Sequence, residues 1–161
     1  MEDGIRFTEF LAYTEQENHR WKEWFREHPH ALALPCDIAG GPTVRELVFH
    51  IFVTDLYFAH RISGHELPDF KALPHATLDE LFAIGEEAAG RFHKFMEIAF
   101  PKDWDEILTL GFANRTASRR KMMAQALLHG VHHRAQLAAV LRQQGLKQGW
   151  VHDFILSDVT P

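Results

Sequence analysis

Two histidines four residues apart, His129 and His133, have the clearest metal-binding spacing in the sequence. Residues i and i+4 of an α-helix lie one above the other on the same face, so two imidazoles at this spacing can bind one ion. With about 100° of rotation per residue, His133 falls on the apolar face of its helical run and His129 at the edge of that face. His132 falls on the more polar side, and we expect it to lie outside the site.

The apolar surroundings of this pair allow two interpretations. Burying an imidazole costs free energy unless its nitrogens find partners, and a bound cation would satisfy them directly. Hydrogen bonds to other side chains or to water would satisfy them as well. A third ligand from another helix would favour the metal-binding interpretation.

His50 is the candidate for that third ligand. It lies inside Leu47–Phe58, a run that is apolar almost all round, and an imidazole buried there needs a specific partner. Together with His129 and His133, it would place three neutral nitrogens around one divalent ion. Three protein ligands leave a position open for water or substrate, which distinguishes a catalytic site from a structural one.

Two other kinds of metal site do not fit the sequence. A ferritin-like dinuclear centre uses Glu-x-x-His motifs on facing helices, whereas Glu46 precedes His50 by four residues. A zinc protease uses a His-Glu-x-x-His motif, and Gly130 occupies the position of its glutamate. The three-histidine centre is therefore the metal site that the sequence supports.

Several polar residues lie near the three histidines in sequence. Gln136 would either orient a metal ligand or bond to the adjacent helix. Arg134 would either bind an acidic group of a substrate or form a salt bridge, and Asp55 is expected to pair locally instead of binding the ion. Cys36 has no neighbour that would lower its pKa, so we expect a passive thiol. Four other histidines are expected at the surface, namely His60, His65, His93 and His132.

Hydrophobic periodicity predicts four helices that could carry these residues. Their predicted ranges are Ile5 to about His28, Thr43 to Gly64, Thr77 to Ala99 and Ala117 to Gln144. Thr43 with Glu46, and Thr77 with Glu80, have the spacing of capping boxes at two helix starts. Gly145 is expected to end the fourth helix in a left-handed conformation.

The connections between these helices differ in character. Prolines and glycines predict a loop of about a dozen residues over 29–42. The segment 106–116 reads as extended, with a short hairpin turning near Gly111. The tail from Trp150 to Pro161 is too apolar to remain in water, so we expect it to pack on the body of the protein or on a second subunit. Four helices with these connections predict an all-α four-helix bundle, in which facing helices build the metal site.

Composition limits the class of protein further. The 161 residues, of which 46% are hydrophobic and 24% charged, predict one globular domain over 1–161. A formal net charge of −5 opposes non-specific binding to nucleic acid. No apolar run has the length of a membrane span, and the first residues do not resemble a secretory signal. A cytoplasmic protein is therefore expected. The single cysteine cannot form an internal disulfide.

The sequence resembles the DinB-like or YfiT-like four-helix metalloenzymes over nearly its whole length. The resemblance is carried by Thr43–His50 in the second helix and by the His-x-x-x-His-Arg-x-Gln pattern of His129–Gln136 in the fourth. The family often has glycine where Ala135 stands here, which leaves the ligands unchanged. The resemblance implies a bundle of the up-down-down-up type, with His50, His129 and His133 holding a divalent metal and water completing its coordination.

The resemblance also implies the chemistry to be expected. Characterised members include bacillithiol and mycothiol S-transferases and a mycothiol-dependent maleylpyruvate isomerase. A metal-dependent hydrolase or a thiol-dependent S-transferase is therefore expected, with a small-molecule substrate and a low-molecular-weight thiol as a candidate cofactor. A non-catalytic bundle that binds a metal or a small ligand is the alternative. Zinc or nickel is the first choice of metal, with iron, manganese or copper next, and a homodimer would be compatible with the apolar tail.

Overall fold

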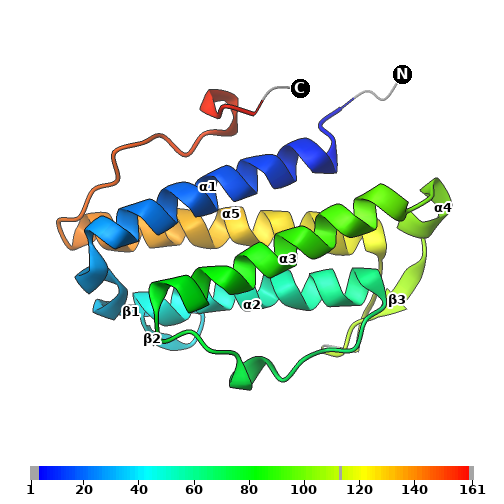
Figure 1. The fold of residues 1–161 in the computed structure, drawn as a ribbon, viewed down its shortest axis with the longest axis horizontal. Coiled ribbons are helices and arrows are strands. Elements are labelled where there is room, and N and C mark those ends of the chain that lie inside the picture. Colours follow the sequence, from blue (N-terminus) through cyan, green and yellow to red (C-terminus); the bar gives the residue numbers. More distant parts are fainter. Residues whose placement is uncertain (1–3, 113, 160–161) are drawn as a thin grey trace.

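The structure is a computed structural model that describes residues 4–112 and 114–159. Four long helices form a bundle: α1 (Phe7–Glu27), α2 (Val44–Ser63), α3 (Leu78–Ile98) and α5 (Arg119–Gln143) (Figure 1). Shorter elements connect them, namely α4 (Pro101–Trp104), the strands β1 (Pro35–Ile38), β2 (Gly41–Thr43), β3 (Ile107–Thr109) and β4 (Thr116–Ser118), and the 3-10 helices Pro29–Ala33, Phe70–Ala72 and Phe154–Leu156.

The helix directions confirm the expected fold class. α1 and α5 run in one direction along the bundle, whereas α2 and α3 run in the other (Figure 1). Two consecutive parallel helices need a connection that returns along their length, and residues 64–77 supply it. α1 and α2 each pack against both α3 and α5. The bundle is therefore of the up-down-down-up type, and α2 and α5, which carry the three candidate histidines, are antiparallel neighbours.

Apolar side chains from all four long helices fill the centre of the bundle. The most completely buried include Leu11, Phe25, Leu47, Leu56, Leu81, Met122, Leu127 and Leu141. The close approach of α3 to α2 depends on Gly85, because a Cβ atom there would lie 2.6 Å from a ring carbon of Phe52. The missing side chain at Gly85 therefore allows the two helices to pack closely.

Only one of the two predicted capping boxes forms. At α3, the Thr77 hydroxyl accepts a hydrogen bond from the backbone N–H of Glu80, and the Glu80 carboxylate accepts one from the backbone N–H of Thr77. At α2, Thr43 is the N-cap residue but its side chain accepts no backbone hydrogen bond. Its hydroxyl instead donates to the Glu46 carboxylate. The predicted capping box at Thr43 is wrong because these two side chains bind each other.

The two connections beside the bundle also contain structure. The predicted extended segment is a hairpin in which β3 and β4 pair antiparallel, with Leu108 opposite Ala117. The predicted loop over 29–42 contains a 3-10 helix followed by the β1–β2 hairpin.

At the end of α5, Gly145 has a φ of 81°, as expected, and the backbone N–H of the next residue donates a hydrogen bond to the Leu141 carbonyl.

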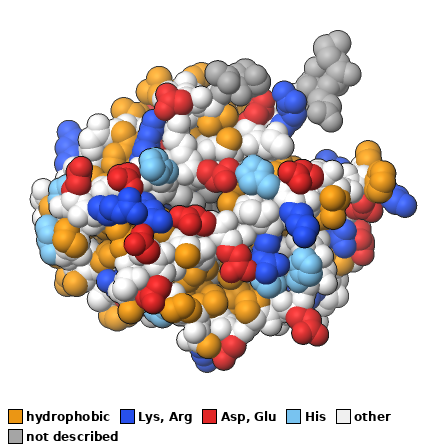
Figure 2. Space-filling view, in the orientation of Figure 1, with side chains coloured by type: hydrophobic (Ala, Val, Ile, Leu, Met, Phe, Trp, Pro, Cys, Tyr) orange, Lys and Arg blue, Asp and Glu red, His pale blue; other side chains and the backbone are white. Residues whose placement is uncertain are grey.

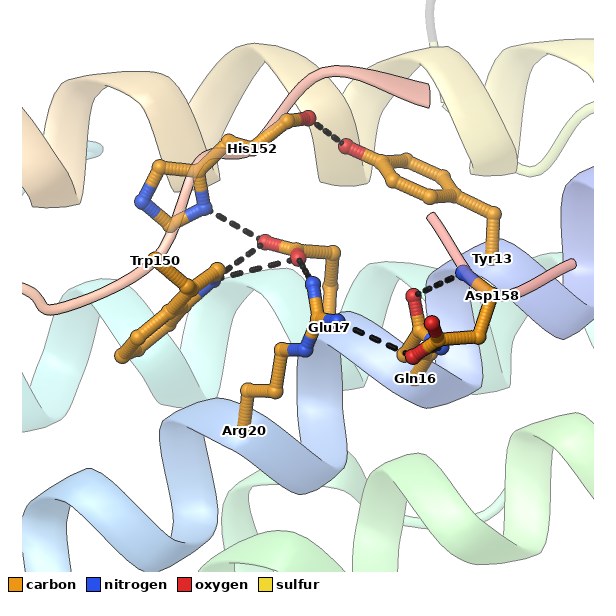
Figure 3. Close-up of polar contacts among 7 residues, drawn as sticks. All are labelled: Tyr13, Gln16, Glu17, Arg20, Trp150, His152 and Asp158. Atoms are coloured by element: carbon orange, nitrogen blue, oxygen red, sulfur yellow. Dashed lines mark hydrogen bonds and ion pairs between the residues drawn. The ribbon is translucent and has the colours of Figure 1, made fainter. Parts of the chain in front are cut away.

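The C-terminal tail packs along α1 of the same chain (Figures 1 and 3). Glu17 is only 1% exposed, and its carboxylate accepts a hydrogen bond from Trp150 Nε1 and lies 2.5 Å from Nδ1 of His152. Burial raises the pKa of the Glu17 carboxyl, but the hydrogen bonds from His152 and Trp150 outweigh it and hold the pKa below its usual value. The Tyr13 hydroxyl donates to the backbone carbonyl of His152. These contacts confirm packing of the tail on the body.

Charged side chains are scattered among hydrophobic and uncharged groups on one face of the molecule (Figure 2). On the face shown in Figure 2, basic and acidic groups are interspersed instead of forming a continuous patch of one sign.

Within the described part of the chain, no helix combines the length and the apolar character that crossing a membrane would require.

Candidate metal centre

The structure brings His50, His129 and His133 together between α2 and α5. One ring nitrogen from each lies within 4.8 Å of the other two. The Nε2 atoms of His50 and His129 are 3.0 Å apart, and the ring centroids of His129 and His133 are 4.3 Å apart. All three side chains are partly buried. The helical spacing on α5 and the antiparallel packing of α2 therefore create one cluster from three separate positions.

The nitrogen atoms of this cluster fit a bound cation. Two Nε2 atoms that face each other at 3.0 Å must share either a proton or an ion. Nδ1 of His129 is buried without a hydrogen-bond partner among the described residues. His133 Nδ1 lies 2.7 Å from the side-chain oxygen of Gln136, which can only accept, so Nδ1 carries the proton and Nε2 keeps its lone pair. This donor set is the one that a divalent transition metal uses.

The pKa values of the three histidines favour their neutral forms. Burial, followed by the neighbouring His133 and His50, lowers the pKa of His129 to about 4. Burial also lowers the pKa of His50 and that of His133. Because a histidine must be deprotonated to bind a metal, the site is already in its ligating state near neutral pH.

Arg134 lies behind the cluster, on the core side of α5. It is 5% exposed, and its Nη1 donates to the side-chain oxygen of Asn18, 3.2 Å away. Gly130 makes room for the guanidinium, because a Cβ atom there would lie 3.0 Å from Nη1. Burial lowers the pKa of Arg134, while the nearby Asp55 carboxyl opposes this effect. The sequence left two roles open for Arg134, namely binding an acidic group of a substrate and forming a salt bridge. The buried position of Arg134 does not fit substrate binding. Its hydrogen bond is to the Asn18 amide instead of to the carboxylate that a salt bridge requires.

Asp55 and His60 lie on α2 away from the cluster. Asp55 is 7% exposed, and its burial raises the pKa of the carboxyl to about 7. His60 was expected at the surface, and this expectation is wrong: it is 6% exposed, with Nδ1 2.6 Å from the Glu66 carbonyl. The connection after α2 folds back over His60, a contact that helical periodicity does not reveal. His65 and His132 are exposed, as expected.

A cavity of about 610 Å3 opens beside His50 and His129. Its walls come from α2, from α5, from the 3-10 helix 70–72 and from the β3–β4 hairpin. Apart from the two histidines, the lining residues are Val53, Thr54, Tyr57, Phe58, Phe70, Leu110, Phe112, Ala117, Lys121, Met122 and Gln125. Helical periodicity does not predict this cavity; the apolar residues of the extended segment 106–116 were the available signal.

Comparison with known proteins gives the family and the fold. The model of the DinB family matches residues 1–158. YjoA, a DinB-like protein from Bacillus subtilis, is 19% identical, with a TM-score of 0.64 over 91% of this chain and 96% of its own. YfiT from the same organism, described as "a probable metal-dependent hydrolase with an unusual four-helix bundle topology", is 17% identical, with a TM-score of 0.67 over 91% of this chain and 94% of its own. No curated protein matches significantly. The chain belongs to the DinB family.

Proposed function

We propose that this protein is a metal-dependent enzyme that acts on a small molecule at a centre formed by His50, His129 and His133. One observation carries the proposal: three neutral imidazoles converge beside a cavity large enough for a substrate, and two of them, His50 and His129, line it. A purely structural metal site is closed by its protein ligands, whereas three ligands beside a cavity leave room for a reacting molecule.

The residues of the chain have separate tasks in this proposal. His50, His129 and His133 would hold the ion, and Gln136 keeps the proton of His133 on Nδ1 so that Nε2 faces the site. The bound ion would supply a Lewis acid and lower the pKa of a water or thiol bound to it. The apolar walls of the cavity would exclude bulk water from the substrate.

Hydrolysis and thiol transfer are the two reaction classes that we propose. Among the described residues that line the cavity there is no aspartate or glutamate, so none of these residues supplies a carboxylate base to activate the nucleophile. Activation of a water or a thiol at the metal would meet this need. The description of YfiT favours hydrolysis, whereas the thiol-dependent members of the family favour transfer to or from a low-molecular-weight thiol.

Zinc and nickel are the proposed metals, because imidazole ligands suit both. The first test is elemental analysis of the full-length protein purified without added metal, alongside His50→Ala and the control His93→Ala. His93 is partly buried against Glu15 and lies outside the cluster. We expect about one metal ion per chain in the wild type and the control, and loss of the ion in His50→Ala. No metal in the wild type, even after zinc is supplied, would refute the proposal.

The second test separates catalysis from binding alone. The zinc-loaded protein would be given 4-nitrophenyl esters as hydrolase substrates, and chlorodinitrobenzene with a panel of thiols as transferase substrates. Turnover that disappears in His50→Ala but persists in His93→Ala would support the enzyme. Stoichiometric metal without turnover of either kind would instead favour the alternative, a non-catalytic bundle that binds a metal or a small ligand.

A further inference from the structure

We propose that the cavity beside the three histidines takes amphipathic monoanions, with an apolar body against α2 and α5 and an anionic group such as a carboxylate at Lys121. The proposal rests on the proposed function, because it names the substrate class of the same site. Its evidence is the composition of the walls, the single charge among them and the spacing along α5.

The walls of the cavity suit a hydrocarbon or aryl body. Val53 and Phe58 line it from α2, Met122 from α5, and Phe112 from the hairpin. Phe112 is 53% exposed and its ring centroid lies 5.4 Å from that of Tyr57. Small-molecule sites are typically concave and mostly apolar, with a few polar groups that fix orientation. An apolar ligand body would cover this surface and remove it from water.

The charge on the cavity wall is positive. Among the lining residues that the structure describes, Lys121 alone carries a formal charge, and its ammonium group forms no ion pair with the described residues. No carboxylate from residues 4–112 or 114–159 lines the cavity, although the chain as a whole has 22 acidic and 17 basic residues. This local reversal of charge favours anionic ligands over neutral or cationic ones.

The distance from Lys121 to the centre sets the shape of the ligand. Lys121, Gln125 and His129 follow one another at i, i+4 and i+8 on the same face of α5, and all three line the cavity. Eight residues of α-helix span about 12 Å. A ligand that reaches both ends therefore carries its reacting group at the histidines and its anionic group about two helical turns away.

The test compares octanoate with its neutral analogue octanamide by isothermal titration calorimetry. The full-length protein would be used both zinc-loaded and after treatment with EDTA. In the wild type we expect octanoate to bind about fivefold more tightly than octanamide at low salt, the range of one solvent-accessible ion pair. Lys121→Met should bring the two affinities together, and Lys121→Arg should keep them apart. The control Lys147→Met, at an exposed position outside the cavity, should behave like the wild type.

Two results would overturn the proposal: equal affinity of the wild type for the two compounds, or a preference for octanoate that survives in Lys121→Met. The metal analysis keeps this outcome separate from the proposed function. If zinc binds through His50 but neither compound binds, the ligand class is wrong and the metal centre stands. If octanoate is preferred through Lys121 but no metal binds, the ligand class stands and the proposed function fails.

Discussion

Gln136 offers the sharpest test of the metal centre, because it contacts a proposed ligand without being one. Its side-chain oxygen lies 2.7 Å from Nδ1 of His133, near the short end of the range for a hydrogen bond of this type. Gln136→Met keeps the length of the side chain and removes the acceptor. The His133 ring would then be free to turn or to move its proton to Nε2, and either change removes a lone pair from the ion.

The expected loss follows from the kind of contact that is removed. Replacing a residue that orients a metal-binding histidine typically lowers metal affinity by about 10- to 100-fold. Gln136 is partly exposed, so water can partly replace its oxygen, and we expect a loss of about tenfold, or about 1.4 kcal/mol. Competition with a chromophoric zinc chelator at neutral pH would measure this change.

Two further variants decide what causes any loss. Gln136→Glu keeps an acceptor at the same position and should retain the zinc affinity of the wild type. Gln143→Met makes the same substitution at an exposed position on the same helix and should change nothing. Unchanged affinity in Gln136→Met, or an equal loss in Gln143→Met, would show that the hydrogen bond to His133 does not support a metal ligand.

Three other predictions concern the stability of the bundle, measured as free energies of unfolding in urea. The pKa of Asp55 is raised from 3.8 to about 7; the neutral carboxyl therefore favours the folded state at low pH, and this stability is lost as pH rises through about 7. The free energy of unfolding of the wild type should therefore fall by about 2 to 3 kcal/mol between about pH 5 and 8, and Asp55→Asn should remove this fall. Identical pH profiles of the wild type and Asp55→Asn would contradict this assignment. Thr77→Ala should lower the free energy of unfolding by about 1 kcal/mol through loss of the cap. Thr43→Ala should lower it less, because the Thr43 hydroxyl caps no backbone group. Equal losses in the two variants would contradict this expectation. Gly85→Ala should destabilise the fold by about 1 to 3 kcal/mol, because its Cβ would meet an aromatic ring at 2.6 Å. Gly90→Ala, with nothing within 4 Å of its Cβ, should stabilise the fold by up to about 1 kcal/mol. A gain of stability in both variants would contradict the close packing at Gly85.

Much of the bundle could be predicted because its signals are local. The spacing of His129 and His133 places them on one face of any regular helix. The apolar run around His50 indicates that the helix carrying His50 is buried. Gly145 and the Thr77 capping pair mark helix ends through backbone chemistry that does not depend on the rest of the fold. The structure adds the packing of α2 against α5, which brings the separate positions together.

The features that could not be predicted depend on contacts between distant segments. His60 is buried by a connection that folds back over α2. Arg134 lies near Asn18 of α1 and Asp55 of α2. The cavity combines two helices with a hairpin and a 3-10 helix, so no single periodic pattern describes it. At Thr43, the competing contact with the Glu46 side chain has the same spacing as the expected cap, and only coordinates distinguish the two.

The β3–β4 hairpin gives the cavity a wall that is separate from the ligand-bearing helices. It meets α2 through the Tyr57 hydroxyl, which accepts from the Gly111 N–H, and through Arg61, which donates to the Thr109 carbonyl. The three histidines are positioned by helices whose other faces form the hydrophobic core. Substitutions at the hairpin tip can therefore reshape what the cavity accommodates while leaving the imidazoles in place. Sequence divergence along this connection therefore changes which molecules fit the cavity and leaves the three-histidine cluster intact.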